Sequence, residues 1–388
     1  MKPEKKIVPL WFGYYAIPLV AIVLSGLINA LYLSLSHYRN YTDIGYQSFC
    51  ALSKAINCDT VSQSSHSILF DIPVAVWGVV GYLFYSLILS CALRSSKKNG
   101  LWTILFLNGI CFTLISLYFA GISAFIIKSY CILCILSYGI NMLLTFYPWL
   151  IFKRFCSDGF FTTFKADLLI IKQTKQLYTA LIIFLICISF ILFFFPKYWV
   201  YSFPKPEKSI ATGMTEDHSP WIGAKDDPEL IIHEYSDYLC FQCKKMHQYL
   251  RKLVHTYPDK IRLVHHNYPL DHEFNPVLVD KPFHIGSGKL ALISIYAAST
   301  DNFWEVNDRL YTLSQFKSAI SLKTIGEKTR LDPKILSSVL TNPSVRKKLD
   351  HDIRKGLKLR ITGTPSYVIN GKVYEGTIPP EIIRTIQN

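Results

Sequence analysis

Charged side chains are scarce in the first half of this 388-residue sequence. Residues 1–200 hold 21 of them, 15 basic and 6 acidic, whereas residues 201–388 hold 47, 26 basic and 21 acidic. This scarcity excludes a fully soluble protein, because the surface of a soluble domain carries more charge. A hydrophobic content of 51% also excludes a disordered chain. The second half, by contrast, has the composition of an ordinary globular domain.

Long uncharged runs stand where the charges are missing. Five runs reach the ~20 residues that a helix needs to cross a bilayer. They cover residues 7–38, 72–93, 100–127, 129–152 and 177–196. The first run could also be a signal peptide, since the chain starts with basic residues. It is longer than the roughly 7–15 residues of a signal-peptide core, and no small-residue cleavage site follows it, so we expect a retained helix and five spans in all.

The few charges of the first half are unevenly distributed between the connections. With the N-terminus in the cytoplasm, the inner segments hold eleven Lys and Arg residues and the outer connections hold three, Arg39, Lys54 and Lys128. This bias predicts that orientation, with everything after residue 196 on the outer side. The net charge of +14 is then mainly topological, and we expect no nucleic-acid partner. The spans also lack the ionisable residues that line a transport pathway.

This topology divides the ten cysteines. Four fall within spans or on the inner side, where we expect small buried or reduced residues: Cys91, Cys111, Cys156 and Cys187. Six fall on the outer side as three close pairs: Cys50 and Cys58, Cys131 and Cys134, Cys240 and Cys243. An oxidising compartment allows static disulfides there, but two pairs have the C-x-x-C spacing that suits thiol–disulfide exchange. A zinc site is disfavoured because those two pairs are about a hundred residues apart, so we expect no metal.

The first two pairs stand in an ordered set of motifs. Cys50 and Cys58 lie in the first outer loop, Ser64 follows in `CDTVSQSS`, `DIPVAVWGVVGY` opens the next span, and `YCILC` stands at the outer end of the fourth. This set resembles the vitamin K epoxide reductase (VKOR) family over roughly residues 10–152. The resemblance implies an all-α transmembrane four-helix bundle, here followed by a fifth helix. It also implies a quinone, ubiquinone or menaquinone, as the electron acceptor.

The resemblance gives each of these residues a role. Cys134 would lie against the quinone ring, Cys131 would exchange with Cys58, and Cys50 would meet the external thiol partner. Ser64 would donate a hydrogen bond to a quinone oxygen as negative charge develops on it. The same stretch offers alternatives to this serine: Ser62, Ser65 and Ser67.

The second half begins with a tether and continues as an α/β pattern. Residues 201–228 are rich in Pro, Ser and charge without hydrophobic periodicity, which predicts a linker. A β-type run over 229–236 leads to Cys240 and Cys243, which open an amphipathic helix to Thr256. The helix N-terminus stabilises a thiolate at the first cysteine, and the second cysteine resolves a mixed disulfide.

The rest of the second half continues the alternation of strands and helices. A second strand lies in `KIRLVHHNYPL`, residues 283–358 are helical, and a Thr364-Pro365 step precedes a hairpin and a short last helix. This order resembles the DsbA-like disulfide oxidoreductases, which have an α/β thioredoxin-like fold with a helical insertion. The resemblance places Pro365 as the cis-proline beside the dithiol, with an ordinary turn proline as the alternative. Gln242 replaces the histidine common in that family, which leaves substrate preference and direction open.

Together these patterns predict four parts: a VKOR-like bundle over 1–176, a fifth transmembrane helix over 177–200, a linker over 201–228 and a DsbA-like domain over 229–388. We expect an enzyme of the bacterial inner membrane, embedded in the lipid bilayer, whose last domain faces the extracytoplasmic side. It would form disulfides in envelope proteins by passing electrons from substrate thiols through its three cysteine pairs to the membrane quinone pool. The alternatives are the same relay acting as a reductase or isomerase, and a membrane-anchored binding module with structural disulfides.

Overall fold

A computed structural model describes residues 11–52, 55–94, 100–201, 203–204, 210–300, 302–314 and 321–387. The chain divides into two compact units, Met1–Trp199 and Val200–Asn388. Lys54, the basic start of the chain and positions 202 and 205–209 of the predicted linker lie outside the described residues.

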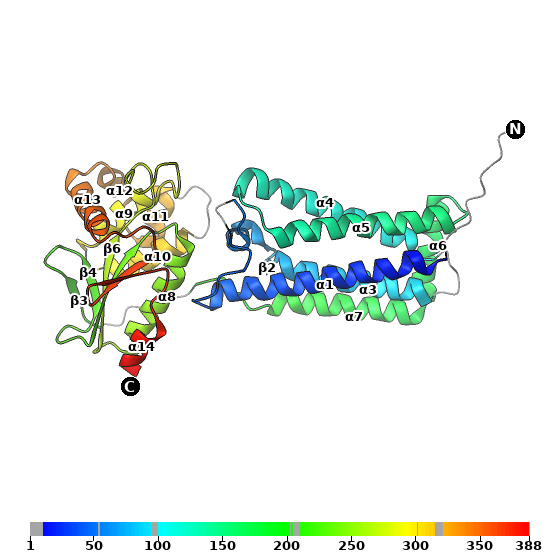
Figure 1. Cartoon of the computed structure of the whole chain (residues 1–388), viewed down its shortest axis with the longest axis horizontal. Helices are drawn as coiled ribbons and strands as arrows, with labels where there is room; N and C mark the ends of the chain where they lie inside the picture. The colour runs from blue at the N-terminus through cyan, green and yellow to red at the C-terminus, as the bar shows by residue number, and fades with distance from the viewer. Residues whose placement is uncertain are drawn as a thin grey trace. The chain divides into compact units, whose positions relative to one another are not determined.

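The N-terminal unit is a bundle of long apolar helices that run alongside one another (Figure 1). Among the described residues, five helices are long and apolar enough to cross a membrane. They are α1 (Gly13–Thr42), α3 (Val74–Arg94), α4 (Trp102–Gly121, extended by η2, Ile122–Ile127), α5 (Ile132–Phe155) and α7 (Lys175–Phe194). Large apolar side chains such as Phe125 and Phe193 are more than 80% exposed, as a surface in contact with lipid requires. The five predicted spans are confirmed.

Close packing of α4 and α5 holds the bundle core together. A Cβ on Gly109 of α4 would come within 2.6 Å of the Leu144 carbonyl oxygen of α5, so only glycine permits this approach. Leu144 is fully buried beside Tyr85 of α3, whose hydroxyl donates to the same carbonyl at 2.9 Å. Three of the predicted spans therefore meet at Leu144, and the buried core of the bundle also contains residues of α1 and α7, such as Leu19 and Leu177.

One helix of this unit is absent from the sequence prediction. The amphipathic α6 (Phe160–Gln173) follows the fourth span. Its buried Asp167 accepts hydrogen bonds from the backbone N–H groups of Leu101, at 2.7 Å, and Thr103, at 3.1 Å. The carboxylate thus caps the start of α4, which has no capping side chain of its own. Hydropathy alone missed α6 because the helix is half polar.

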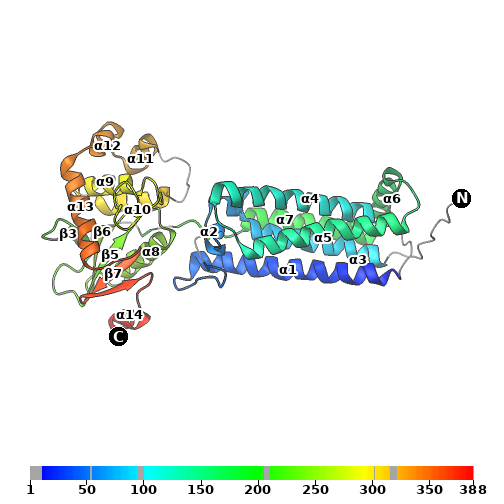
Figure 2. The same cartoon turned by 45° about the horizontal axis from the view of Figure 1, so that its top comes forward.

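The C-terminal unit is built on a six-stranded sheet of order β3-β4-β6-β5-β7-β8 (Figures 1 and 2). The central pair β5 and β6 is parallel, and the other pairings are antiparallel. The strands are β3 (Thr212–Met214), β4 (Pro220–Gly223), β5 (Leu230–Ser236), β6 (Ile261–Asn267), β7 (Ser366–Ile369) and β8 (Lys372–Glu375). This is the predicted thioredoxin-like α/β fold.

Helices cover both faces of this sheet. Along β5, Glu234 contacts His247 of α8 (Phe241–Thr256), which in turn contacts α10 (Phe303–Leu313), while Tyr235 packs in the opposite core. The helical insertion between β6 and β7 also contains α9 (Ser287–Ala297), α11 (Leu322–Thr329), α12 (Pro333–Val339) and α13 (Pro343–Lys358). The chain ends in α14 (Pro380–Gln387).

The predicted linker was too long, because β3 and β4 lie within it. β4 pairs with β6 through Trp221 opposite Val264, so this segment is an integral edge of the sheet. These strands have three and four residues and contain Gly213, Pro220 and Gly223. Such short strands show no alternation, and their glycine and proline residues resemble turn signals.

Candidate active site

The outer loop of the N-terminal unit holds the first cysteine pair as a disulfide. Cys50 and Cys58 are bonded, with their Cα atoms 5.6 Å apart. Cys58 begins the short helix α2 (Cys58–Ser62), and the Asn57 side chain caps it by accepting from the N–H groups of Asp59 and Thr60. The buried Asp59 carboxylate accepts from the Asn40 side chain of α1 and from the Ser48 N–H, each at 3.0 Å. These contacts fix the loop to the end of α1.

The second pair lies against the first. Cys131 caps the N-terminus of α5, where its Sγ accepts from the Cys134 N–H at 3.2 Å. Cys50, Cys58 and Cys131 form one buried cluster, and the partly buried Cys134 packs against it. A short backbone bridge holds the two segments together, since the Asn57 N–H donates to the Tyr130 carbonyl at 2.9 Å. The fold thus brings together four sulfurs that the sequence separates.

A mostly apolar cavity of about 430 Å³ opens beside this cluster. Cys58, Cys131 and Cys134 line it together with aromatic side chains such as Trp77 of α3 and Phe119 of α4. Its volume and apolar lining fit a small aromatic ring system. A cavity that combines thiols with apolar walls can bring a membrane-soluble electron acceptor to a dithiol.

Ser64 lines the same cavity, as do two of its predicted alternatives, Ser62 and Ser67. Its hydroxyl donates to the Val61 carbonyl at 2.8 Å, so it must rotate to donate to a ligand. Ser65 is exposed and is not among the lining residues. The structure therefore leaves three of the four serines as candidates.

The lining residues that the sequence analysis missed include two ionisable ones, His37 of α1 and Tyr138 of α5. Tyr138 is one helical turn beyond Cys134, and this i, i+4 spacing could have identified it. His37 is the single histidine in the first uncharged run, but no periodicity shows that it faces a cavity.

The third pair begins a helix in the C-terminal unit. Cys240 caps the N-terminus of α8, and its Sγ accepts from the Cys243 N–H at 3.2 Å. Its thiol donates to the Thr364 carbonyl at 3.4 Å, and the peptide bond between Thr364 and Pro365 is cis. The hydrogen bond places the predicted proline step beside the dithiol.

The two sulfurs of this pair differ in acidity. Burial acts to raise the pKa of the Cys240 thiol, but the hydrogen bond from Cys243 and the nearby His284 outweigh burial and lower it. Burial and the adjacent Cys240 sulfur raise the pKa of Cys243 well above its usual range. His284 lies 3.2 Å from the Asp237 carboxylate and has no counterpart in the sequence prediction. Cys240 is thus the more readily ionised sulfur and the better nucleophile.

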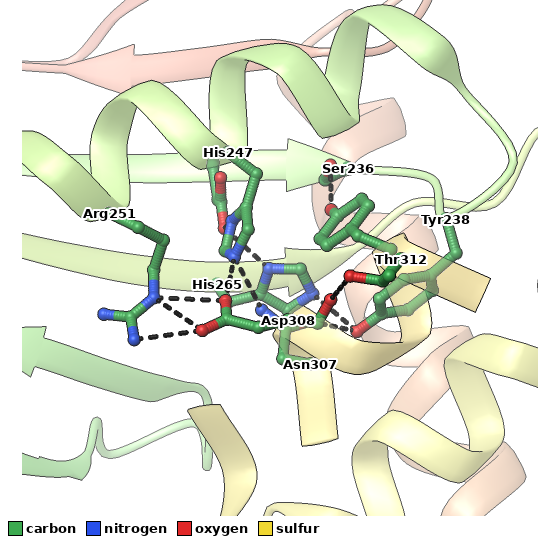
Figure 3. A network of polar contacts seen from close by, with 10 residues as sticks. Ser236, Tyr238, His247, Arg251, His265, Asn307, Asp308 and Thr312 are labelled. Atoms are coloured by element: carbon green, nitrogen blue, oxygen red, sulfur yellow. Dashed lines mark hydrogen bonds and ion pairs between the residues drawn. The ribbon is translucent and has the colours of Figure 1, made fainter. Parts of the chain in front are cut away.

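A buried network of polar side chains supports α8 from below (Figure 3). His247 of α8 hydrogen-bonds to Glu234 of β5 and to Asp308 of α10, each at 2.9 Å. Glu234 also contacts His265 of β6 at 2.8 Å, and Arg251 forms an ion pair with Asp308 at 3.1 Å. Burial acts to lower the pKa of His247, but Glu234 and Asp308 outweigh it and raise this pKa to about 9. The protonated histidine therefore ties α8 to both neighbouring elements.

Three groups of this network could in principle hold a metal ion. The donor atoms of Glu234, His247 and His265 lie within 4.8 Å of one another. Both ring nitrogens of His247, however, already face carboxylates. A protonated imidazole has no lone pair for a metal, so this cluster is better described as a buried ion-pair network.

Two family models match the chain. The vitamin K epoxide reductase family matches residues 17–149, and the thioredoxin model matches residues 215–387. The N-terminal unit thus carries a VKOR domain and the C-terminal unit a thioredoxin-like domain, as the sequence predicted.

The chain is also similar to individual proteins. The probable disulfide bond formation protein D of Bacillus anthracis is 24% identical over 184 residues, which cover 45% of this chain and 80% of that protein. The protein of the same name from Bacillus cereus is 25% identical over 159 residues, 38% of this chain and 69% of that protein. Among solved structures, oxidised BdbD from Bacillus subtilis is 21% identical, covering 46% of this chain and 96% of its own, with a TM-score of 0.36. The two domains and the three cysteine pairs support a membrane thiol–disulfide oxidoreductase.

Proposed function

We propose that this membrane thiol–disulfide oxidoreductase forms disulfides in proteins outside the cytoplasm and passes the electrons to a membrane quinone. The observation that carries the proposal is the buried cluster of Cys50, Cys58, Cys131 and Cys134 on the wall of an apolar cavity. A structural disulfide has no need of a second dithiol and a ligand-sized cavity beside it. A quinone supplies a two-electron oxidant that is soluble in the bilayer.

The first step is exchange at the thioredoxin-like domain. A substrate thiolate attacks Sγ of Cys240 in the oxidised pair, and the Cys243 thiolate leaves. The second substrate thiolate then displaces Cys240, so the substrate gains one disulfide and the pair gains two electrons. The low pKa of Cys240 favours this direction, because it makes Cys240 a good leaving group in the second displacement.

The second step returns the Cys240–Cys243 pair to its disulfide. We assign Cys50 as the sulfur that meets this pair and Cys58 as the sulfur that passes the electrons to Cys131. Cys58 and Cys131 share one buried cluster, so the inner exchange needs no large movement of the loop. Joining both domains in one chain raises their effective concentration for the outer exchange.

The last step belongs to Cys131 and Cys134. Cys134 lines the cavity and is the sulfur that we place against the quinone ring, with Ser64 donating to a ring oxygen. The dithiol becomes a disulfide, its two electrons reduce the acceptor, and the acceptor takes up two protons. The domain order and the extracytoplasmic position of the last domain are part of this proposal.

Purified full-length protein tests the proposal directly. With a reduced peptide as electron donor and decylubiquinone as acceptor, the parent chain should reduce the quinone and oxidise the peptide in equal amounts. Cys134→Ser and Cys243→Ser should each stop quinone reduction, whereas the matched control Cys111→Ser, at an exposed position of α4, should keep it. Quinone reduction that survives both variants would refute the relay.

The alternative is the same relay run in reverse, as a reductase. The redox state of Cys240 and Cys243 in cells distinguishes the two directions. An oxidant keeps Cys240 and Cys243 mostly as a disulfide, and thiol trapping would detect it. A mostly reduced pair would favour the reductase. Gln242 is compatible with this direction because it replaces the histidine common in DsbA-like oxidants.

A further inference from the structure

His37 is a buried ionisable side chain on a transmembrane helix. It lies on α1, is 3% exposed and lines the cavity beside the cysteine cluster. Ionisable side chains that are buried within transmembrane helices are rare and usually belong to functional sites. None of the electron-transfer steps above uses it.

Its hydrogen bonds form a chain with a single direction. The Ser67 hydroxyl donates to the Ser64 carbonyl at 2.8 Å, so the Ser67 oxygen is an acceptor toward its other neighbour, Nε2 of His37, at 3.4 Å. With the proton on Nε2, Nδ1 of His37 is an acceptor, and the Tyr198 hydroxyl donates to it at 2.8 Å. Every donor thus points from Tyr198 toward the serines of the cavity wall.

The two ends of this series of hydrogen bonds, Tyr198 and Ser67, lie in different surroundings. Tyr198 follows α7 and is half-buried in a group of aromatic rings that includes Tyr38 and Trp199. Aromatic rings of this kind gather at membrane–water interfaces. Ser67 lies on the cavity wall beside Ser64. The series of hydrogen bonds therefore runs from an interfacial position into the cavity.

We propose that His37 is a positioning residue that relays a proton to the quinone oxygen on the serine side of the cavity. The proposal rests on the function proposed above. The Nε2 proton passes to Ser67, the Ser67 hydroxyl proton passes to the ring oxygen, and the Tyr198 hydroxyl returns a proton to Nδ1. Tyr198 is reprotonated from the outer solution, which receives protons when substrate thiols ionise.

The balance of the step agrees with this route. Oxidation of the Cys131–Cys134 dithiol breaks two S–H bonds, forms one S–S bond and supplies two electrons, and the proton of Cys131 leaves to the outer solution. Two ring oxygens then need one proton each. Cys134 can protonate the oxygen that it faces, whereas the opposite oxygen needs a second donor. His37 and Ser67 stand on the wall that also carries Ser64.

The test compares His37→Gln and Tyr198→Phe with Tyr38→Phe, in full-length protein with reduced peptide and decylubiquinone. Tyr38 is the matched control because it contacts the Tyr198 ring and is 47% exposed. We expect His37→Gln to lower kcat about 100-fold with KM nearly unchanged, the usual contribution of a general acid. Tyr198→Phe should lower kcat about tenfold and increase the solvent deuterium isotope effect, because proton supply becomes limiting. Tyr38→Phe should match the parent chain.

A second readout needs no quinone. In protein carrying ¹⁵N-labelled histidine, magic-angle-spinning NMR in lipid bilayers should show His37 protonated at Nε2, with an Nδ1 signal that shifts in Tyr198→Phe. Parent-level kcat in both variants, or a raised KM with unchanged kcat, would overturn the relay while leaving the proposed function intact. Failure of the parent chain itself to reduce quinone would instead refute the proposed function.

Discussion

The two C-x-x-C motifs use the same local geometry in different surroundings. In each, the first cysteine caps a helix and its sulfur accepts from the N–H of the second at 3.2 Å. Cys134 then faces an apolar cavity within a helical bundle, whereas Cys240 faces the Thr364 carbonyl beside a cis-proline. The comparison teaches that the spacing provides a reactive dithiol, whereas the surrounding walls determine which partner can reach it; in the proposed function these partners are a quinone at Cys134 and a protein thiol at Cys240.

The largest expected effects come from removing one cysteine of each dithiol, which should block the reaction with one partner only. Cys134→Ser should abolish quinone reduction but leave peptide exchange at the thioredoxin-like domain. Cys240→Ala should abolish peptide oxidation but keep quinone binding. Parallel assays of decylubiquinone reduction and peptide oxidation would check the losses, and a decylubiquinone titration would check binding to Cys240→Ala. Full peptide oxidation in Cys240→Ala would contradict the assignment of separate partners.

A second prediction concerns Ser64 on the cavity wall, a feature of the quinone-side dithiol and not of the Cys240–Cys243 pair. Ser64→Ala should lower kcat for quinone reduction by about 100-fold, as expected when a donor to a developing negative charge is removed. Ser65→Ala is the matched control, since Ser65 is exposed outside the cavity lining. If both variants behave alike, another residue holds the quinone oxygen.

A third prediction concerns the buried ion-pair network that packs against α8, the helix that carries Cys243. The pKa of His247 rises from 6.5 to about 9 on folding, so its stabilisation is complete below pH 6.5 and disappears as the pH rises through 9. His247→Gln should therefore destabilise the domain at pH 6 by about 3 kcal/mol more than at pH 9.5. Hydrogen exchange of β5 in the full chain measures this difference, with His255→Gln, at an exposed position of α8, as control.

The smallest expected effect sharpens the choice between oxidant and reductant. Gln242→His should place a cation near the Cys240 thiolate, lower the Cys240 pKa further and speed oxidation of the peptide a few-fold. Quinone reduction by the chemically reduced protein should not change. The pH dependence of Cys240 alkylation would report the pKa shift, and an unchanged profile would show that position 242 does not act on the thiolate.

The sequence was sufficient for the parts that follow from composition and local pattern. Scarce charge predicted five spans, and the strand before Cys240 predicted the start of α8. The Thr364-Pro365 step also lies where the pattern placed it, because its hairpin is a local feature.

Contacts between distant segments were beyond the sequence. Asp59 holds the Cys58 loop through Asn40, and His37 meets Tyr198 across 161 positions. The short strand β4 pairs with β6, and β3 pairs with β4, so both depend on the sheet and not on a pattern in their own residues. Local periodicity does not reveal such pairings, so most of the cavity wall could be identified only once the helices were packed.

One measurement tests the central claim, that the two dithiols belong to a single electron path. The fully reduced chain is mixed with decylubiquinone without oxygen, and thiol trapping with mass spectrometry then follows each cysteine pair. In the parent chain the quinone should oxidise all three pairs. In a variant carrying Cys50→Ser and Cys58→Ser it should oxidise Cys131 and Cys134 alone and leave Cys240 and Cys243 reduced. Equal oxidation of Cys240 and Cys243 in that variant would contradict the account.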